Sequence, residues 1–255
     1  MSNAIETKGL RKVFGDLVAV DGIDLAVPRG SFYGFLGPNG AGKSTTIKCL
    51  TGLLRPTAGQ FRILDLDPTV EPVAVKKKIG VMPEDLALFD RLTGAETLTF
   101  VGQVHGLDAA SLRARSAELL DLMDLRQAAG DLVADYSHGM RKKISLAAAL
   151  LPAPRLLFLD EPFEGIDAIA SRQIKELLSQ FVKGGGTIFL TSHILEIVER
   201  LCDHIGIIHK GKLVAQGTVA ELRGSAGAGK TLEDLFLEYV GAERTTTTKF
   251  SWLAG

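Results

Sequence analysis

The chain lacks several features that mark whole classes of protein. It has only two cysteines, Cys49 and Cys202, which stand far apart in apolar surroundings and in no metal-binding or redox spacing. We expect both thiols to be buried and reduced, as in a cytosolic protein. The longest apolar stretch, 146–159, is interrupted by two prolines and an arginine and falls short of the roughly 18 residues that cross a bilayer. The N-terminus has no signal-peptide pattern, so a role at a membrane is expected to depend on a partner.

An excess of charge of one sign is also lacking. The 255 residues include 29 Lys and Arg and 30 Asp and Glu, which gives a formal net charge of −1. Proteins that bind nucleic acid directly usually present a basic surface, so this class is disfavoured. The one basic triplet, 76–78, is interpreted as a solvated helix end. A hydrophobic content of 46% over this length supports the core of a globular protein with one large or two small domains.

A glycine-rich segment follows a short apolar run, 31–36, that predicts a buried strand. The segment reads Gly37, Pro38, Asn39, Gly40, Ala41, Gly42, Lys43, Ser44 and Thr45. Its glycines allow successive backbone N–H groups to point into one concavity, which the positive end of the following helix also faces. We therefore expect a nucleotide-phosphate cradle, in which Lys43 reaches the β- and γ-phosphates and the Ser44 hydroxyl binds Mg²⁺.

A second segment, 224–231, fits the same Gly-x-x-x-x-Gly-Lys-[Ser/Thr] pattern. It follows a stretch, 218–223, that is typical of a short helix. Because the motif binds phosphate only after a strand, we interpret 224–230 as a flexible connector. Thr231 is predicted to cap a last amphipathic helix.

The order of predicted elements indicates an α/β fold. Short strands are expected at 5–10, 22–27, 31–36 and 60–64, and helices without intervening strands at 95–105 and 111–125. From residue 155 the chain alternates strands at 156–159, 187–190 and 205–208 with helices at 168–182 and 194–201, before a terminal hairpin that turns at 210–211. Such alternation predicts a mostly parallel sheet covered by helices.

Two carboxylates follow the apolar strand predicted at 156–159. Because side chains alternate along a strand, Asp160 and Glu161 are expected to point in different directions and to have different roles. Ligands of parallel sheets bind at the carboxyl ends of the strands. We therefore expect Asp160 to hold the Mg²⁺ shell and Glu161 to polarise an attacking water. His193 stands just past another buried strand, at the same sheet edge, where it could bridge the γ-phosphate and that water.

The segment 136–143 predicts a second anion site. Ser137 is a natural helix N-cap and Gly139 lies beside it, and a helix start of this kind binds anions. One nucleotide loop and two anion-binding helix ends are explained if two copies of the chain face each other. Each copy would then lend its second site to the γ-phosphate of the other.

These segments together resemble a known family. In order and spacing, 37–45, 137–140, 156–161, 165–167 and His193 are similar to the motifs of the ATP-binding cassette (ABC) ATPases, which drive ABC transporters. The similarity extends from residue 4 to about 240. It implies a P-loop NTPase fold with a mostly parallel sheet core, N-terminal antiparallel strands and a helical subdomain.

The resemblance also implies a domain organisation and nucleotide-binding roles. A single ATPase domain would span 4–241, with a helical subdomain at about 90–150 and a polar C-terminal tail at 242–255. Phe14 matches the aromatic residue that stacks on adenine. By the same resemblance, Glu161 is the catalytic glutamate, His193 is the switch histidine, and 165–167 is the D-loop.

Two motifs depart from the family pattern. Ser137, His138, Gly139 and Met140 stand where the signature Leu-Ser-Gly-Gly-Gln is expected; Ser137 and Gly139 are kept, whereas Tyr136, His138 and Met140 differ. Glu84 occupies the place of the Q-loop glutamine, and its carboxylate could still reach Mg²⁺. This variant set, with the ending at 232–237, is most similar to the ABC-2 exporter branch, whose ATPase and permease are separate polypeptides.

Other nucleotide-binding classes fit less well. A GTPase needs an Asn-Lys-x-Asp guanine reader, and the only two asparagines, Asn3 and Asn39, are not in that context. A small-molecule kinase needs neither the segment at Ser137 nor the D-loop. A regulator that does not hydrolyse is disfavoured by Glu161 and His193. A soluble ABC-type ATPase that acts without a permease remains the main alternative.

The expected mechanism is a head-to-tail dimer that closes on two Mg·ATP molecules and reopens after hydrolysis. The cofactors are therefore ATP and Mg²⁺, and the partners are a second copy of the chain and an integral membrane permease. Docking is expected on residues 84 to about 98, at the cytoplasmic face of the membrane.

Overall fold

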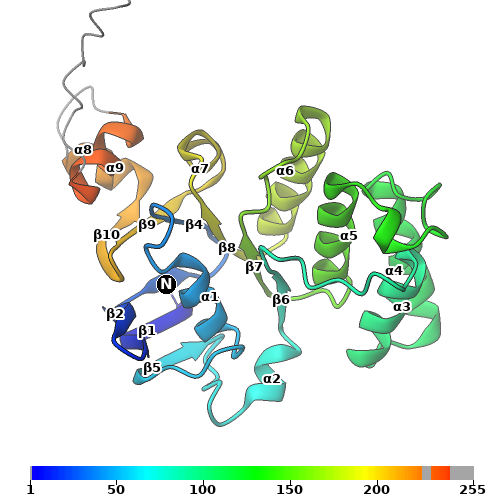
Figure 1. Cartoon of the computed structure of the whole chain (residues 1–255), viewed down its shortest axis with the longest axis horizontal. Coiled ribbons are helices and arrows are strands. Elements are labelled where there is room, and N and C mark those ends of the chain that lie inside the picture. The colour runs from blue at the N-terminus through cyan, green and yellow to red at the C-terminus, as the bar shows by residue number, and fades with distance from the viewer. Residues whose placement is uncertain (1, 226–230, 242–255) are drawn as a thin grey trace, which may run out of the picture.

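A computed structural model describes residues 2–225 and 231–241. Figure 1 shows a sheet that runs through the middle of the molecule, with helices α3, α4 and α5 gathered at one end of its long axis. The strands β1, β2 and β5 and the helices α8 and α9 lie toward the other end. The expected connector at 226–230 and the polar tail at 242–255 lie outside the described residues.

The central sheet has the strand order β10-β9-β4-β8-β7-β6. Its strands are β4 (Phe32–Leu36), β6 (Ile79–Met82), β7 (Leu156–Asp160), β8 (Thr187–Ser192), β9 (His204–His209) and β10 (Lys212–Thr218). The pairs β4–β8, β4–β9, β6–β7 and β7–β8 are parallel, and only β9–β10 is antiparallel. The predicted α/β class with a mostly parallel sheet is confirmed, and so is the terminal hairpin.

A second sheet is antiparallel and consists of the N-terminal strands and β5. Its strands are β1 (Asn3–Phe14), β2 (Leu17–Ile23), β3 (Ala26–Pro28) and β5 (Ala58–Ile63). The strand predicted at 22–27 is divided: residues 22–23 end β2 and 26–27 lie in β3, because the pairing with β1 is irregular here, with Gly22 at a φ of 68° and residues 24–25 outside both strands. Strand β6 and the short helix α2 (Pro72–Lys76) were not predicted.

The helices are α1 (Lys43–Leu50), α3 (Gly94–Val104), α4 (Ala109–Leu122), α5 (His138–Leu150), α6 (Ala168–Lys183), α7 (Leu195–Leu201), α8 (Val219–Ser225) and α9 (Leu232–Val240), with a short 3-10 turn η1 (Val133–Asp135). Between α3 and α5 the chain forms no strand, as predicted. Thr231 caps α9 with a reciprocal capping box, because its hydroxyl accepts from the Asp234 N–H and the Asp234 carboxylate accepts from the Thr231 N–H. None of the helices in the two described ranges has the length and apolar character needed to cross a bilayer.

The central sheet is buried on both faces, which explains the continuous apolar runs of its strands. Leu157, Leu159 and Leu190 face one core, formed with α5, α6 and α7. Phe158 and Phe189 face the other core, formed with α1 and the antiparallel sheet. Cys49 and Cys202 are buried and free, as predicted. Buried parallel strands of this kind end together at one edge, where polar side chains can meet.

Candidate functional site

The glycine-rich loop lies between the end of β4 and the start of α1. Gly42 is the N-cap of α1 with a φ of 109°, a left-handed conformation that other residues rarely adopt. A Cβ atom at Gly42 would lie 2.4 Å from the Ala19 carbonyl oxygen, and one at Gly37 would lie 2.5 Å from that of Ile208. The loop can therefore pack closely on β2 and β9 only because glycine occupies these two positions.

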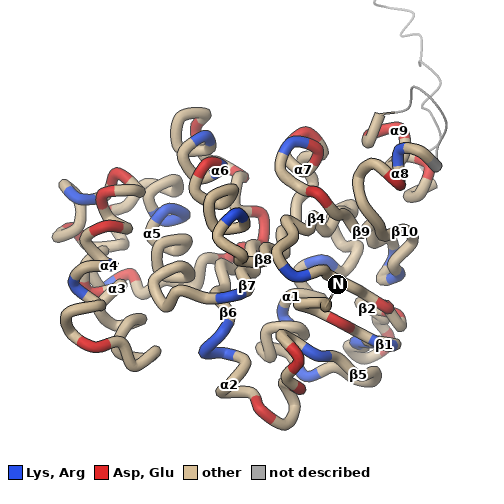
Figure 2. Tube along the Cα trace, turned by 180° about the vertical axis from the view of Figure 1, so that it is seen from behind, with Lys and Arg blue, Asp and Glu red and all other residues tan. Residues whose placement is uncertain are grey.

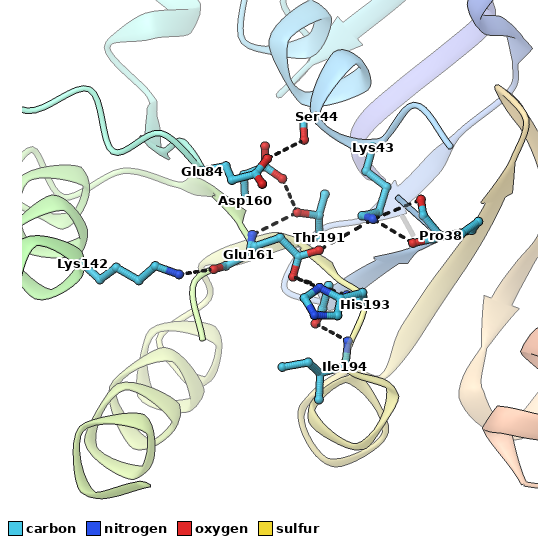
Figure 3. Close-up of polar contacts among 12 residues, drawn as sticks. Pro38, Lys43, Ser44, Glu84, Lys142, Asp160, Glu161, Thr191, His193 and Ile194 are labelled. Atoms are coloured by element: carbon cyan, nitrogen blue, oxygen red, sulfur yellow. Dashed lines mark hydrogen bonds and ion pairs between the residues drawn. The ribbon is translucent and has the colours of Figure 1, made fainter. Parts of the chain in front are cut away.

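Lys43 points back into the loop that it follows. Its ammonium donates to the carbonyl oxygens of Gly37, at 2.7 Å, and Pro38, at 3.4 Å. The same Nζ atom lies 3.7 Å from Oε1 of Glu161, and both side chains are only 7% exposed (Figure 3). A cation held among carbonyl oxygens at the start of a helix is suited to bind an anion that replaces those carbonyls.

Four oxygen-bearing side chains gather at the start of α1. The Ser44 hydroxyl donates to Oε2 of Glu84 at 3.2 Å and also bonds to Asp160. The Thr191 hydroxyl donates to Oδ1 of Asp160 at 2.5 Å. Asp160 is only 2% exposed, and burial raises its pKa, with the charges of Glu84 and Glu161 acting in the same direction. The group joins the loop to the ends of β6 and β7, as Figure 3 shows.

Glu161 follows Asp160 but leaves the strand. Its φ is 49°, so the backbone turns at this residue and the two carboxylates have different neighbours. Oε2 of Glu161 lies 3.0 Å from Nδ1 of His193, and the His193 N–H points at the same oxygen at 3.4 Å. The separation that we had expected from strand alternation comes instead from this left-handed turn.

One open pocket of about 660 Å³ connects these groups. It is lined by Asn39, Gly40, Gly42, Lys43, Ser44 and Thr45 of the loop, by Glu84, Glu161 and His193, and by Phe14 at its other end. Phe14 is 44% exposed, with the Lys12 ammonium 4.8 Å from its ring centroid. The pocket thus has a polar end suited to phosphates and an exposed aromatic ring suited to a base.

The helix end at Ser137 does not belong to this pocket. Ser137 is the N-cap of α5, and its hydroxyl accepts from the Met140 N–H at 3.2 Å. Ser137, Gly139 and Met140 are not among the described residues that line the pocket. Figure 1 shows α5 and α1 on different parts of the molecule. The structure therefore brings together every predicted site residue except these three.

Sequence reasoning missed three residues at the site. Thr191 bonds to Asp160 and accepts from the Glu161 N–H at 3.1 Å. It stands at the end of β8, two residues before His193, so the strand-end pattern could have revealed it. Lys142 donates to the Glu161 carbonyl oxygen, and Lys210 lines the pocket from the β9–β10 turn. No sequence signal identified either lysine.

The ABC transporter family model matches residues 20–164 of the chain. The chain belongs to the ABC transporter family. The daunorubicin/doxorubicin resistance ATP-binding protein DrrA of Streptomyces peucetius is 43% identical over 227 residues, which cover 89% of this chain and 69% of that protein. The linearmycin resistance ATP-binding protein LnrL of Bacillus subtilis is 37% identical, over 90% of this chain and 74% of that protein.

Solved structures agree with this ABC assignment. The ATP-binding subunit of an ABC transporter superposes with a TM-score of 0.88 at 32% identity, covering 92% of this chain and 99% of that chain. A dimeric ATP-binding cassette bound to ADP and Pi superposes with a TM-score of 0.78 over 84% of this chain and 98% of that chain; at 22% identity it supports the fold alone. The chain is thus an ATP-binding and ATP-hydrolysing ABC subunit, as the sequence predicted.

Proposed function

We propose that two copies of this chain close head to tail on two ATP molecules, and that hydrolysis reopens them to drive a separate membrane permease. The observation that carries the proposal is the distance in the fold between two anion-binding elements. The phosphate loop, Glu161 and His193 share one pocket, whereas the helix end at Ser137 lies on a different part of the same chain. A second copy is the simplest source of a Ser137 helix end for each pocket.

Within the pocket, each side chain has a task that follows from its contacts. Lys43 would exchange its bonds to the loop carbonyls for bonds to the β- and γ-phosphates. Glu161 would accept a hydrogen bond from the attacking water, because its carboxylate is buried and directed toward the open pocket. His193, bound to that carboxylate through Nδ1, would contact the γ-phosphate. The exposed face of Phe14 would stack on adenine.

Mg²⁺ fits the group formed by Ser44, Glu84 and Asp160. A hydroxyl and two carboxylates are the oxygen donors that this cation prefers, and phosphate oxygens and waters complete its shell. The raised pKa of Asp160 indicates a buried carboxylate whose charge a cation would stabilise. When bound, the ion would neutralise charge on the phosphates and hold them in line for displacement.

The permease is proposed to dock in an apolar groove of about 580 Å³ beside the segment 84–98. Phe89 and Val104, which line the groove, are 55% and 69% exposed. The charged side chains in the lining are Lys76 and Lys77, at the basic stretch between α2 and β6 in Figure 2. We therefore infer that a cytoplasmic segment of the permease with apolar and acidic side chains binds there. The chain would thereby lie at the cytoplasmic face of the membrane.

Export is the proposed direction of transport. The relatives DrrA and LnrL are named for resistance to daunorubicin, doxorubicin and linearmycin, and this chain matches most of their length. An action on another soluble target, without a permease, is the alternative that the docking experiment addresses.

A mixing experiment tests the shared sites. Lys43→Ala and Ser137→Ala are each expected to be inactive, since every site in either dimer carries a defect. In an equal mixture about half of the dimers are mixed, and each mixed dimer has one intact site, so about one quarter of wild-type turnover should return. If Ser137 served the nucleotide of its own chain, no activity would return.

A second experiment tests docking. The chain is purified from detergent-solubilised membranes, and an equimolar multi-span polypeptide is expected with it. The double variant Lys76→Glu, Lys77→Glu should lose that polypeptide and keep the ATP turnover of the isolated subunit, whereas Lys183→Glu, on α6, should keep both. Retention of the polypeptide by the double variant would contradict docking in the groove, and its absence from the wild type would favour the alternative without a permease.

A further inference from the structure

Lys142 is a buried cation that contacts the backbone of Glu161. It lies on α5, is only 3% exposed, and its Nζ atom donates to the Glu161 carbonyl oxygen at 2.8 Å. Figure 3 shows the side chain reaching from its helix to the turn after β7. Burial lowers the pKa of Lys142, against the charges of Glu164, Glu161 and Glu84, which act to raise it. Burying a lysine is costly, so a specific contact is expected to justify its place.

Glu161 has an unusual backbone that outside contacts hold in place. Its left-handed φ of 49° is rare for a residue with a side chain and costs free energy. Its N–H donates to the Thr191 hydroxyl on β8, and its carbonyl oxygen accepts from Lys142 on α5. Its carboxylate contacts His193 and Lys43. Strained residues persist where their surroundings fix them from several sides, as they do here.

We propose that Lys142 is a positioning residue for Glu161: by holding the carbonyl oxygen, it keeps the backbone in the conformation that directs the carboxylate toward His193 and the pocket. Lys142 does not line the pocket among the described residues, so it acts through Glu161 and not on the nucleotide. Without the ammonium, the Glu161 carbonyl oxygen would lose its short hydrogen bond at 2.8 Å and would keep the longer one from the Glu164 N–H, at 3.4 Å, so the turn could relax.

The position of Lys142 on α5 gives the contact a second consequence, which rests on the proposed function. Ser137, at the start of the same helix, is the residue that would meet the nucleotide of the partner copy. A helix moves as a rigid element, so a shift of α5 on dimer closure also moves Lys142. The orientation of Glu161 is thereby linked to closure of the dimer, and hydrolysis is favoured only when the partner's nucleotide is engaged.

The test is a double-mutant cycle between Lys142 and Glu161. We expect Lys142→Met to lower kcat for ATP about 10- to 100-fold, from loss of one buried hydrogen bond, while the Kd for ATP and dimer formation change little. In the Glu161→Gln background, the same substitution should change the single-turnover rate by less than about twofold, because the carboxylate on which it acts is already gone. Lys143→Met, on the neighbouring half-buried lysine, is the control and should keep wild-type turnover.

The outcomes separate this inference from the proposed function. The positioning role would be overturned if Lys142→Met lowered the rate by the same factor in the Glu161→Gln background as in the wild type, or if Lys142→Met kept the wild-type kcat. Either result would count even if the dimer forms. Absence of the dimer in Glu161→Gln with Mg·ATP would instead contradict the proposed function. If Lys142→Met does not fold, Lys142→Gln takes its place in the cycle with the same criteria, since its polar side chain is one bond too short to keep the contact.

Discussion

Nδ1 of His193 lies 3.0 Å from Oε2 of Glu161, although 32 positions separate the two residues in the chain. Parallel pairing of β7 and β8 produces this proximity, because Asp160 pairs with Thr191 in the register of the two strands. Each residue follows its strand within two positions, so both emerge at the same sheet edge (Figure 3). The contact fixes the imidazole against the carboxylate that faces the pocket.

His193→Ala should therefore lower kcat by roughly 10²-fold, within the usual range for a residue that assists proton transfer or orients one that does. The Kd for ATP should change much less, since Lys43 and the loop remain. Steady-state hydrolysis and calorimetric titration measure the two quantities. His204→Ala is a suitable control because His204 contacts Asp203 and lies outside the pocket lining in the described ranges. Wild-type kcat in His193→Ala would remove this residue from the mechanism.

Lys43→Ala should weaken ATP binding by at least about 100-fold, because it removes the buried ammonium that donates to the loop carbonyls. Calorimetry on the isolated chain measures this directly. Lys48→Ala, at the other end of α1, should bind ATP normally. An unchanged affinity in Lys43→Ala would contradict the assignment of the phosphate cradle.

Glu84→Gln tests the departure from the family glutamine. The substitution removes one of two carboxylates beside the Ser44 hydroxyl. We expect the Mg²⁺ concentration for half-maximal turnover to rise about three- to tenfold, since one anionic oxygen donor becomes a neutral amide. Asp85→Asn, at the next exposed position, should leave the Mg²⁺ dependence unchanged. An identical Mg²⁺ titration for Glu84→Gln would exclude Glu84 from the metal shell.

Asp160→Asn should lower ATP hydrolysis and raise the stability of the protein without nucleotide. Burial raises the pKa of Asp160, so the folded state binds its proton more tightly than the unfolded chain does. The free energy of unfolding from this group therefore falls as the pH rises from the unfolded pKa, about 3.9, through the higher folded pKa. The neutral amide avoids that loss and still offers an oxygen to Thr191.

Without nucleotide, Asp160→Asn should unfold about 2–4 °C above wild type at neutral pH if the gain is near 1 kcal/mol. The difference should shrink as the pH is lowered through that window, and Mg·ATP should stabilise the variant less than wild type. Thermal unfolding across a pH series measures both effects. A variant less stable than wild type at neutral pH would contradict the sign.

The sequence predicted the parts of this molecule that depend on local apolar runs. The buried strands around Phe158 and Phe189 have no polar interruption, so their ends were clear and the chemistry of Asp160 and His193 could be placed there. The capping box at Thr231 could also be predicted, because it is a local pattern whose two residues are three positions apart in the chain.

The remainder depends on contacts between segments far apart in the chain. β1 runs to Phe14, well beyond the expected 5–10. The sequence did not indicate this length, because one side of the antiparallel strand is exposed and carries polar residues. The turn at Glu161 is stabilised by Thr191 and Lys142, which lie 30 and 19 positions away. Hydrophobic periodicity contains no information on such pairs. The strand-end pattern could have placed Thr191 at this edge of the sheet, but not its bond to Glu161, and no sequence signal pointed to the contact with Lys142.

The most direct test of the account is the oligomeric state of Glu161→Gln with saturating Mg·ATP, measured by light scattering on a gel-filtration column. The substitution should slow turnover by roughly 10²- to 10⁴-fold, the span typical of a general base. With hydrolysis blocked, the chain should elute with the mass of two copies, and removal of nucleotide should return it to one. A chain that remains a single copy with bound Mg·ATP, in the presence of the permease, would contradict the central claim that ATP joins two copies.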